Sequence, residues 1–168
     1  MKLTMRLGAD SYDIVIKRGA LGNLGQLTDL ANRKVFIVTD TGVPIQYAKT
    51  VKAQCADGCI FVVPQGEASK SIKVYTTVLQ AMLEFGMTRA DLVVAVGGGV
   101  VGDMAGFAAA TYMRGIQFIN CPTTTLSQFD SSIGGKVAVD LGETKNIVGA
   151  FWQPKLVVID PDVLATLP

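Results

Sequence analysis

The sequence predicts one α/β domain of the Rossmann-like, doubly wound type, with a mainly parallel sheet. Five short apolar runs, four of them rich in Val and Ile, offer no polar face, which suits strands covered by helices on both sides. Segments of helical period lie between these runs, and such alternation is typical of this class. The runs are VFIVT at 35–39, IFVV at 60–63, LVVAV at 92–96, IQFI at 116–119 and LVVI at 156–159.

The remaining elements follow from local patterns along the chain. Alternating polar and apolar residues at 2–7 and 12–16 predict an N-terminal β-hairpin. Residues 134–151 break the strand and helix rhythm and predict a β-rich excursion. Helical periods are found at 21–30, 43–54, 72–83 and 103–113.

Length and composition restrict the class of protein. A chain of 168 residues accommodates one full-sized domain, so we expect residues 1–168 to form a single unit. Lys and Arg number 15 against 14 for Asp and Glu, which gives no reason to expect nucleic acid or a membrane surface as partner. The uncharged stretch from Leu92 to Gly102 is far shorter than the roughly 20 residues of a membrane span. Arg6 and Asp10 lie where a signal peptide would be apolar, so we expect a cytoplasmic protein.

The types of side chain exclude several kinds of chemistry. The sequence has no histidine, which excludes Ser-His-Asp and Cys-His catalysis and a histidine metal site in this chain. We therefore expect no metal ligands here. The cysteines at 55, 59 and 121 form no C-x-x-C pair, and we interpret them as reduced packing residues.

Polar residues follow four of the predicted strands at the point where each strand ends. Ligands of open α/β sheets bind beyond the carboxyl ends of the strands, so these segments are expected to converge on one edge. They are Asp40-Thr41-Gly42, the segment 64–70, the glycine loop with Asp103, and the segment 122–125.

The glycine loop is ambiguous by itself. Gly97, Gly99 and Gly102 satisfy G-x-G-x-x-G, in which glycines let the backbone approach a pyrophosphate at a helix N-terminus. The loop follows about the third sheet strand, however, and residues 115–125 contain no acid for a ribose, unlike the usual Rossmann fingerprint. The segment is therefore either a dinucleotide site of another kind or a tight turn, and Asp103 is either a ligand or a residue at a helix start.

Two further segments also have both a structural and a functional interpretation. The threonines at 123–125 either cap a helix or contact a ligand. DSSIGGK at 130–136 lacks the spacing of a P-loop, and its lysine and Lys145 are either solvated or phosphate partners.

Taken together, colinear segments from about residue 35 to the end resemble the 3-dehydroquinate synthases, a family of sugar-phosphate cyclases. The combination is highly specific, although the glycine loop alone is not. The segments are GEASK at 66–70, GGGVVGDMAGFAAATYMRG at 97–115, PTTTLSQFDSSIGGK at 122–136, KNIVGAFWQP at 145–154 and TLP at 166–168.

The resemblance implies an N-terminal NAD-binding domain in which the cofactor lies across the strand ends. Asp40 resembles the acid that binds the ribose, and Lys145 a lysine near both cofactor and substrate. The positions implied to bind NAD are Asp40, Glu67, Lys70, Gly97, Gly98, Gly99, Val100, Gly102, Asp103, Thr123, Thr124 and Lys145.

The resemblance also implies a set of residues for a phosphorylated sugar acid. Asp130, Lys136 and Asn146 match positions that meet the substrate, with Lys136 and Asn146 orienting it and Asp130 fixing a hydroxyl or the lysine. Arg114 resembles an arginine that reaches the substrate phosphate of a neighbouring subunit, which implies a homodimer.

The sequence departs from the family pattern in three respects. Gly42 and Asp140 stand where family members commonly have asparagine, which affects one cofactor hydrogen bond and one loop. In the family a divalent metal, Zn or Co, is held by a glutamate and two histidines of a helical C-terminal domain. We therefore expect the metal only in the full-length enzyme, and the chain ending at Pro168 to be inactive alone.

The implied activity is conversion of 3-deoxy-D-arabino-heptulosonate 7-phosphate to 3-dehydroquinate and phosphate in the shikimate pathway, with NAD as a catalytic redox cofactor. Two alternatives are another sugar-phosphate cyclase, such as a 2-deoxy-scyllo-inosose synthase, and the N-terminal domain of a glycerol or iron-dependent alcohol dehydrogenase. DSSIGGK and KNIVGAFWQP favour the cyclases. A third interpretation is a binding module without catalysis of its own.

Overall fold

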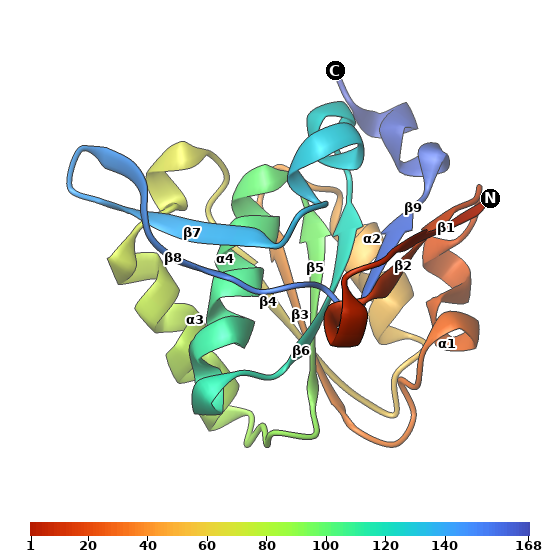
Figure 1. Cartoon of the computed structure of the whole chain (residues 1–168), viewed down its shortest axis with the longest axis horizontal. Coiled ribbons are helices and arrows are strands. Elements are labelled where there is room, and N and C mark those ends of the chain that lie inside the picture. The colour runs from red at the N-terminus through yellow and green to blue at the C-terminus, as the bar shows by residue number, and fades with distance from the viewer.

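A computed structural model describes residues 1–168 and confirms the predicted Rossmann-like α/β class (Figure 1). Seven strands form one sheet in the order β1-β2-β9-β6-β5-β3-β4. Only the pairing of β1 with β2 is antiparallel, as the N-terminal hairpin requires. The strands are β1 (Lys2–Met5), β2 (Tyr12–Ile16), β3 (Lys34–Asp40), β4 (Asp57–Val63), β5 (Leu92–Gly97), β6 (Gln117–Pro122) and β9 (Leu156–Ile159).

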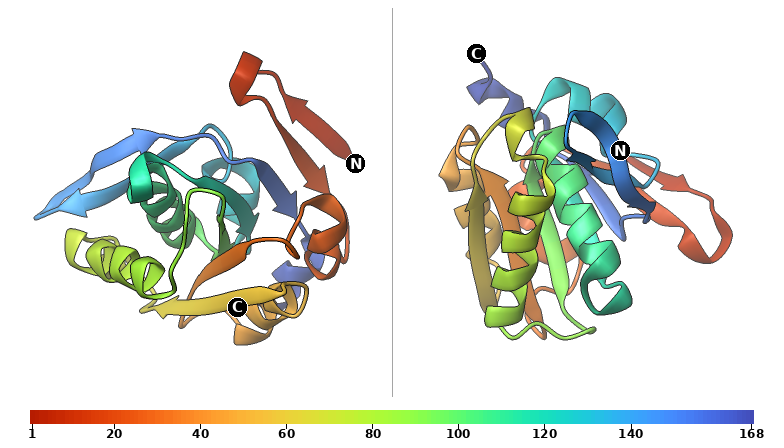
Figure 2. Two further views of the ribbon diagram at one scale, coloured as in Figure 1. Left: turned by 90° about the horizontal axis from the view of Figure 1, so that it is seen from below. Right: turned by 90° about the vertical axis from the view of Figure 1, so that its left-hand side faces the viewer.

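Helices cover both faces of this sheet, as Figures 1 and 2 show. α3 (Ile72–Glu84) and α4 (Gly99–Thr111) pack on one face, and α1 (Leu24–Leu27) and α2 (Ile45–Lys52) on the other. The central strand β5 is buried along its whole length, because it contributes alternate side chains to both cores. The short helices are η1 (Gly8–Asp10), η2 (Leu21–Asn23), η3 (Glu67–Ser69), η4 (Tyr112–Arg114), the π-helix η5 (Ser127–Ser131) and η6 (Pro161–Thr166).

The excursion predicted at 134–151 is a separate two-stranded hairpin, β7 (Lys136–Leu141) and β8 (Thr144–Phe151). It lies over the outer side of α4, where Val137 and Val139 are buried (Figure 2). Gly106 of α4 permits this approach, since an added Cβ there would lie 2.4 Å from the Val137 side chain. The hairpin therefore extends the core on one side of the sheet.

Two local expectations from the sequence were wrong. The run at 60–63 was expected to be covered on both sides, but β4 is an edge strand and Val62 is 43% exposed. The helix expected at 103–113 begins earlier, at Gly99. Glycine disfavours helices intrinsically. Here Gly102 lets α4 lie close to β6, because an added Cβ would come 3.0 Å from Asn120.

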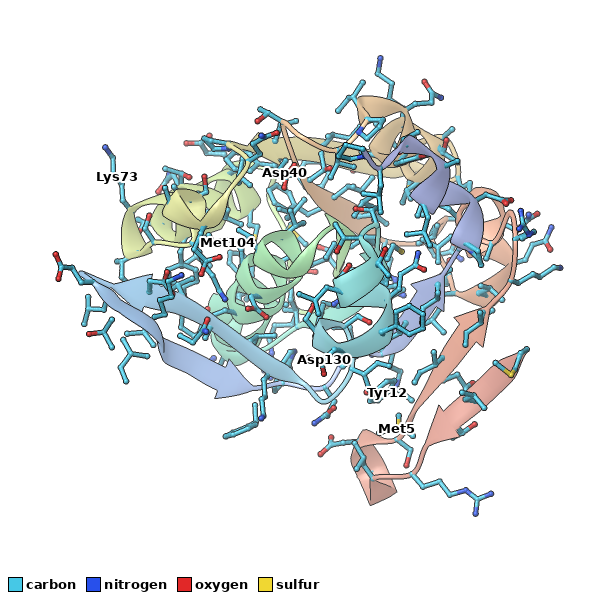
Figure 3. All side chains as sticks on the ribbon, turned by 90° about the horizontal axis from the view of Figure 1, so that it is seen from above. Met5, Tyr12, Asp40, Lys73, Met104 and Asp130 are labelled. Carbon is cyan, nitrogen blue, oxygen red and sulfur yellow. The ribbon has the colours of Figure 1, made fainter.

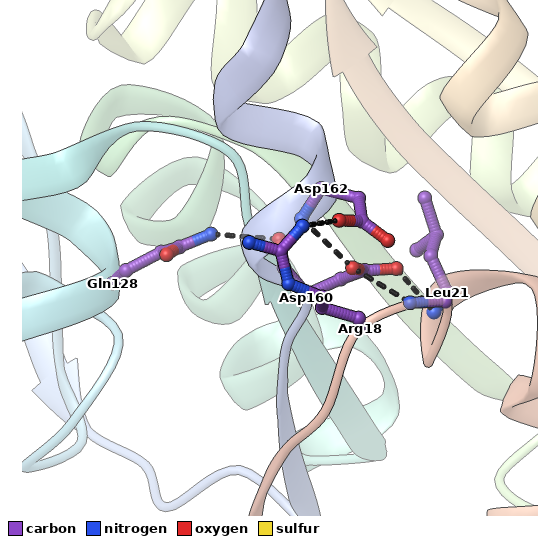
Figure 4. Close-up of polar contacts among 6 residues, drawn as sticks. Arg18, Leu21, Gln128, Asp160 and Asp162 are labelled. Atoms are coloured by element: carbon purple, nitrogen blue, oxygen red, sulfur yellow. Dashed lines mark hydrogen bonds and ion pairs between the residues drawn. The ribbon is translucent and has the colours of Figure 1, made fainter.

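One buried carboxylate joins the first and last parts of the sheet. Asp160, which follows β9, accepts three backbone N–H groups at 3.0 Å, from Gly19, Leu21 and Asp162 (Figure 4). The side chain of Gln128 donates to the Asp160 carbonyl at 3.1 Å and so attaches η5 to the same point. Asp160 thus anchors elements that are distant in sequence.

We predict that Asp160→Ala lowers the free energy of unfolding by about 2–4 kcal/mol, because three N–H groups lose a charged acceptor in a buried place. Urea unfolding of the chain measures this change. Asp162→Ala is the matched control, since Asp162 pairs with the exposed Arg18 and its loss should cost less than about 1 kcal/mol. Equal effects of the two changes would contradict the anchoring role of Asp160.

Candidate functional site

The loops after β3, β4, β5 and β6 converge on the carboxyl edge of the sheet, as predicted. They line a first cleft of about 340 Å³ together with the C-terminal residues. Asp40 lies at this edge in Figure 3. Residues from the four loops that line the cleft are Asp40, Gly42, Val43, Pro44, Gln65, Gly66, Gly98, Gly99, Val100, Thr123 and Thr124.

Asp40 is held by its own loop. Its Oδ1 accepts the backbone N–H of Gly42 at 2.8 Å and that of Val43 at 3.0 Å. The second carboxylate oxygen remains available to hydroxyl groups in the cleft. The space beside Gly42 is filled, because the Gln65 amide oxygen lies only 2.2 Å from where a Cβ of residue 42 would be.

The glycine segment is a short turn followed by the start of a helix. Gly97 ends β5, Gly98 is the connecting residue, and α4 begins at Gly99. The first N–H groups of a helix have no partner within it, and they carry the positive end of the helix dipole. This arrangement suits an anion in the first cleft.

The threonines lie beside this turn and partly cap the next helical segment. Thr124 Oγ1 accepts the Ser127 N–H at 3.2 Å, which confirms the capping interpretation for this residue. An added Cβ at Gly98 would lie 3.1 Å from the Thr124 methyl, so the two loops are in close contact. Thr123 donates its N–H to the Gly97 carbonyl at 2.9 Å.

A buried lysine contacts two residues that line a second cleft. The Lys70 ammonium lies 2.5 Å from the Asp103 carboxylate and also donates to the Asn146 side-chain oxygen. Only 7% of the Lys70 side chain and 19% of the Asp103 side chain are exposed. Asp103 is therefore not at the start of a helix. It lies in the second turn of α4 and forms a buried ion pair.

Burial raises the pKa of Asp103 above its ordinary value, although the hydrogen bond and charge of Lys70 act in the opposite direction. Glu67 and Asp140 contribute to the increase through their negative charge. A carboxyl with a raised pKa in a cleft is a common feature of functional sites.

The second cleft, of about 640 Å³, brings together three residues predicted to meet a substrate. Asp130 from η5, Lys136 from β7 and Asn146 from β8 all line it, and Asp103 forms part of its wall. Asp130 and Lys136 are exposed to solvent. A cation, a carboxylate and an amide on three separate elements can bind a polar molecule that carries an anionic group.

Asp140 is a residue whose contribution the sequence analysis missed. Its Oδ1 accepts the Asn146 N–H at 2.8 Å, and its own N–H donates to the Lys70 carbonyl at 2.8 Å. Asn146 has a φ of 54°, in the left-handed region that asparagine tolerates better than most residues. Asp140 therefore holds Asn146 in this conformation and attaches the hairpin to the loop after β4. Its identity was noted in the sequence, but its contacts depend on the fold of the hairpin.

Three other predicted residues lie at the rim or elsewhere. Glu67 and Lys145 are exposed, 3.9 Å apart, and flank the Lys70 group. Arg114 follows α4 at the amino-terminal edge of β6, so the structure does not bring it to either cleft.

The chain has no group of three or more His, Cys, Asp or Glu side chains able to hold a metal ion. The three cysteines are free, and burial raises the pKa of Cys121 to about 12. None of the helices is both long and apolar enough to cross a bilayer.

Comparison with known proteins assigns the chain to one family. Residues 60–168 match the family described as 3-dehydroquinate synthase N-terminal. The 3-dehydroquinate synthase of Clostridium acetobutylicum is 48% identical over 98% of this chain and 48% of its own length. The chain spans about half the length of the curated relatives it matches.

Solved structures of related cyclases have the same fold. A 2-deoxy-scyllo-inosose synthase complexed with carbaglucose-6-phosphate, NAD+ and Co2+ is 29% identical, with a TM-score of 0.92 over 100% of this chain and 47% of the other. The 2-epi-5-epi-valiolone synthase of Streptomyces hygroscopicus, with NAD+ and Zn2+ bound, is 34% identical, with a TM-score of 0.85 over 97% and 46%. By its match to the family over most of its length, the chain belongs to the 3-dehydroquinate synthase N-terminal family.

Proposed function

We propose that this chain is the NAD-binding part of a 3-dehydroquinate synthase, which converts 3-deoxy-D-arabino-heptulosonate 7-phosphate to 3-dehydroquinate and phosphate. The observation that carries the proposal is the pair of adjoining clefts in a chain of this family, one suited to a dinucleotide and the other to a charged substrate. The reaction belongs to the shikimate pathway.

The first cleft has the chemistry that NAD requires. The open oxygen of Asp40 suits ribose hydroxyls, and the N-terminus of α4 suits the pyrophosphate. Thr123 and Thr124 supply hydroxyls on the facing loop. NAD, when bound, supplies a reversible hydride acceptor. The residues proposed to hold it are Asp40, Glu67, Lys70, Gly97, Gly98, Gly99, Val100, Gly102, Asp103, Thr123, Thr124 and Lys145.

The second cleft is proposed to hold the phosphorylated sugar acid. Lys136 binds its anionic group and Asn146 orients a hydroxyl, because both side chains line this cleft. Asp130 fixes a further hydroxyl or the Lys136 ammonium. Asp103 lines this cleft and pairs with the buried Lys70, so the wall of the cleft is attached to the loop after β4.

The residues of this chain do not fit the divalent metal that the crystallised relatives contain, because no suitable group of ligands is present. We propose that the metal ligands belong to a helical C-terminal domain, within the part of the relatives that this chain does not match. Exposed apolar side chains near the second cleft suit such a contact. They are Leu126, Phe129, Ile147 and Phe151.

Oligomeric state and location complete the proposal. Arg114 is exposed and far from this chain's own clefts, which is consistent with a contact to the substrate phosphate of a neighbouring subunit in a homodimer. We propose a cytoplasmic location, as expected for an enzyme whose substrate is a phosphorylated metabolite.

A second candidate is a 2-deoxy-scyllo-inosose synthase, favoured by the TM-score of 0.92. The 48% identity to a 3-dehydroquinate synthase favours the first candidate. Assays of the complete enzyme with the two sugar phosphates distinguish the candidates by phosphate release. Steady NADH accumulation with a simple alcohol would instead support an alcohol dehydrogenase.

We predict that Lys136→Ala lowers kcat/KM of the complete enzyme for the heptulosonate phosphate by about one to two powers of ten. The reason is the loss of a charge-assisted hydrogen bond worth roughly 1.5–3 kcal/mol. Phosphate release measures the rate. Lys73→Ala is the control, because Lys73 carries the same charge near this edge but points into solvent (Figure 3). Unchanged turnover and affinity in Lys136→Ala would remove Lys136 from the site.

Asp40→Asn should weaken NAD binding to the complete enzyme about tenfold or more. Asparagine keeps the oxygen that accepts from Gly42 and Val43 but replaces the open oxygen by a donor and removes the charge. Calorimetric titration with NAD gives the Kd. Asp57→Asn, an exposed change at the opposite end of the sheet, should leave the Kd unchanged. A wild-type Kd for Asp40→Asn would contradict the ribose contact.

The chain 1–168 by itself should bind NAD weakly or undetectably and release no phosphate from the substrate. The reason is that the proposed metal ligands and half of the proposed substrate pocket lie outside it. Titration and a phosphate assay on the purified chain test this expectation. Phosphate release by the chain alone would contradict the proposed division between two domains.

A further inference from the structure

The turn Gly134–Gly135 directs the chain from η5 into β7 and thereby places Lys136. Both glycines have positive φ, 101° and 68°, in a region that other residues rarely adopt. Lys136 is the first residue of β7, immediately after the turn. The direction of the Lys136 side chain therefore depends on what holds these two glycines in their unusual conformation.

Three contacts hold the turn, and they come from distant parts of the chain. The Gly134 N–H donates to the Tyr12 hydroxyl of β2 at 3.3 Å. The Trp152 N–H donates to the Gly135 carbonyl at 2.8 Å. The Gln153 amide donates to the Gly134 carbonyl at 3.4 Å. The N-terminal hairpin and the segment after β8 thus meet at this point.

Gln153 fits the turn in shape as well as in hydrogen bonding. An added Cβ at Gly135 would lie between 2.5 and 2.7 Å from the three atoms of the Gln153 carboxamide. The side chain therefore occupies the space that glycine leaves open. Its Oε1 atom is buried and has no hydrogen-bond partner. An unpaired buried polar atom reduces stability, so an apolar side chain of the same length would fill this space at lower cost.

We propose that Gln153 is a positioning residue for Lys136: it holds the Gly134–Gly135 turn and so directs the lysine into the second cleft. This inference rests on the proposed function, in which Lys136 binds the substrate. Stabilisation alone does not account for a glutamine at position 153, because its Oε1 atom is buried without a hydrogen-bond partner. Tyr12 supports the same turn from the other side.

The test uses Gln153→Met in the complete enzyme, because methionine keeps the length of the side chain and removes both polar atoms. We expect thermal stability to be unchanged or higher, while kcat/KM for the heptulosonate phosphate falls about fivefold to tenfold. The KM for NAD should not change. A purely structural role predicts that activity and stability change together, so this opposite behaviour separates the two.

Gln54→Met is the matched control. The Gln54 carboxamide also holds backbone groups, accepting from Gly25 at 2.9 Å and donating to Leu21 and Thr50 at 2.9 and 2.8 Å. Its polar atoms are fully paired and lie on the face of the sheet covered by α1 and α2. We expect Gln54→Met to lower thermal stability and to leave kcat/KM within about twofold.

A double-mutant cycle tests whether Gln153 acts through Lys136. In the Lys136→Ala enzyme, Gln153→Met should lower kcat/KM by less than twofold further, since the group that it positions is absent. The same fivefold to tenfold loss in both backgrounds would overturn the inference.

Trypsin cleavage after Lys136 gives a measurement that does not depend on activity, and so separates failure of the inference from failure of the proposed function. Gln153→Met should increase the rate of this cut in the native complete protein several-fold, because the turn opens more often. Gln54→Met should not change it. If the wild-type enzyme does not release phosphate from the heptulosonate phosphate, the proposed function fails, and the cleavage rate alone decides the role of Gln153. An unchanged rate in Gln153→Met would overturn the inference.

Discussion

The buried ion pair between Lys70 and Asp103 is the interaction that holds the loop after β4, α4 and the outer hairpin together. A charge with 7% of its side chain exposed is costly unless it is paired and hydrogen-bonded. Here it meets Asp103 of α4 and Asn146 of β8, while its own carbonyl accepts the N–H of Asp140. Lys70, a single residue in the loop after β4, thereby fixes the outer hairpin against α4, the helix that follows β5.

A consequence of this network is that the two clefts share α4. The first turn of α4, with Gly99 and Val100, faces the first cleft, and Asp103 one turn later faces the second. A group bound at the helix N-terminus and a group bound beside Lys136 would thus contact the same rigid element. This arrangement supports the proposed function, because transfer of hydride between a cofactor and a substrate requires close control of the distance between them.

Much of the fold followed from local patterns, and the exceptions have physical causes. Runs such as LVVAV predict buried strands because a parallel sheet with two covered faces requires apolar side chains throughout. The run at 60–63 has the same composition, yet β4 is at an edge, since strand order depends on long-range pairing. Similarly, the helical period predicted too late a start for α4, which begins at Gly99 because close packing of Gly102 on β6 outweighs the low helix propensity of glycine.

The sequence by itself determined the α/β class, the family and the segments that approach the carboxyl edge, because these depend on periodicity and on motifs that are continuous in the chain. The tertiary structure decided which of these side chains meet. Lys70, Asp103 and Asn146 come from three separate elements and form one group around a buried ammonium. Asp140 holds Asn146, and Gln153 contacts the turn before Lys136. Contacts of this kind require the hairpin to fold over α4, and no local pattern encodes that packing.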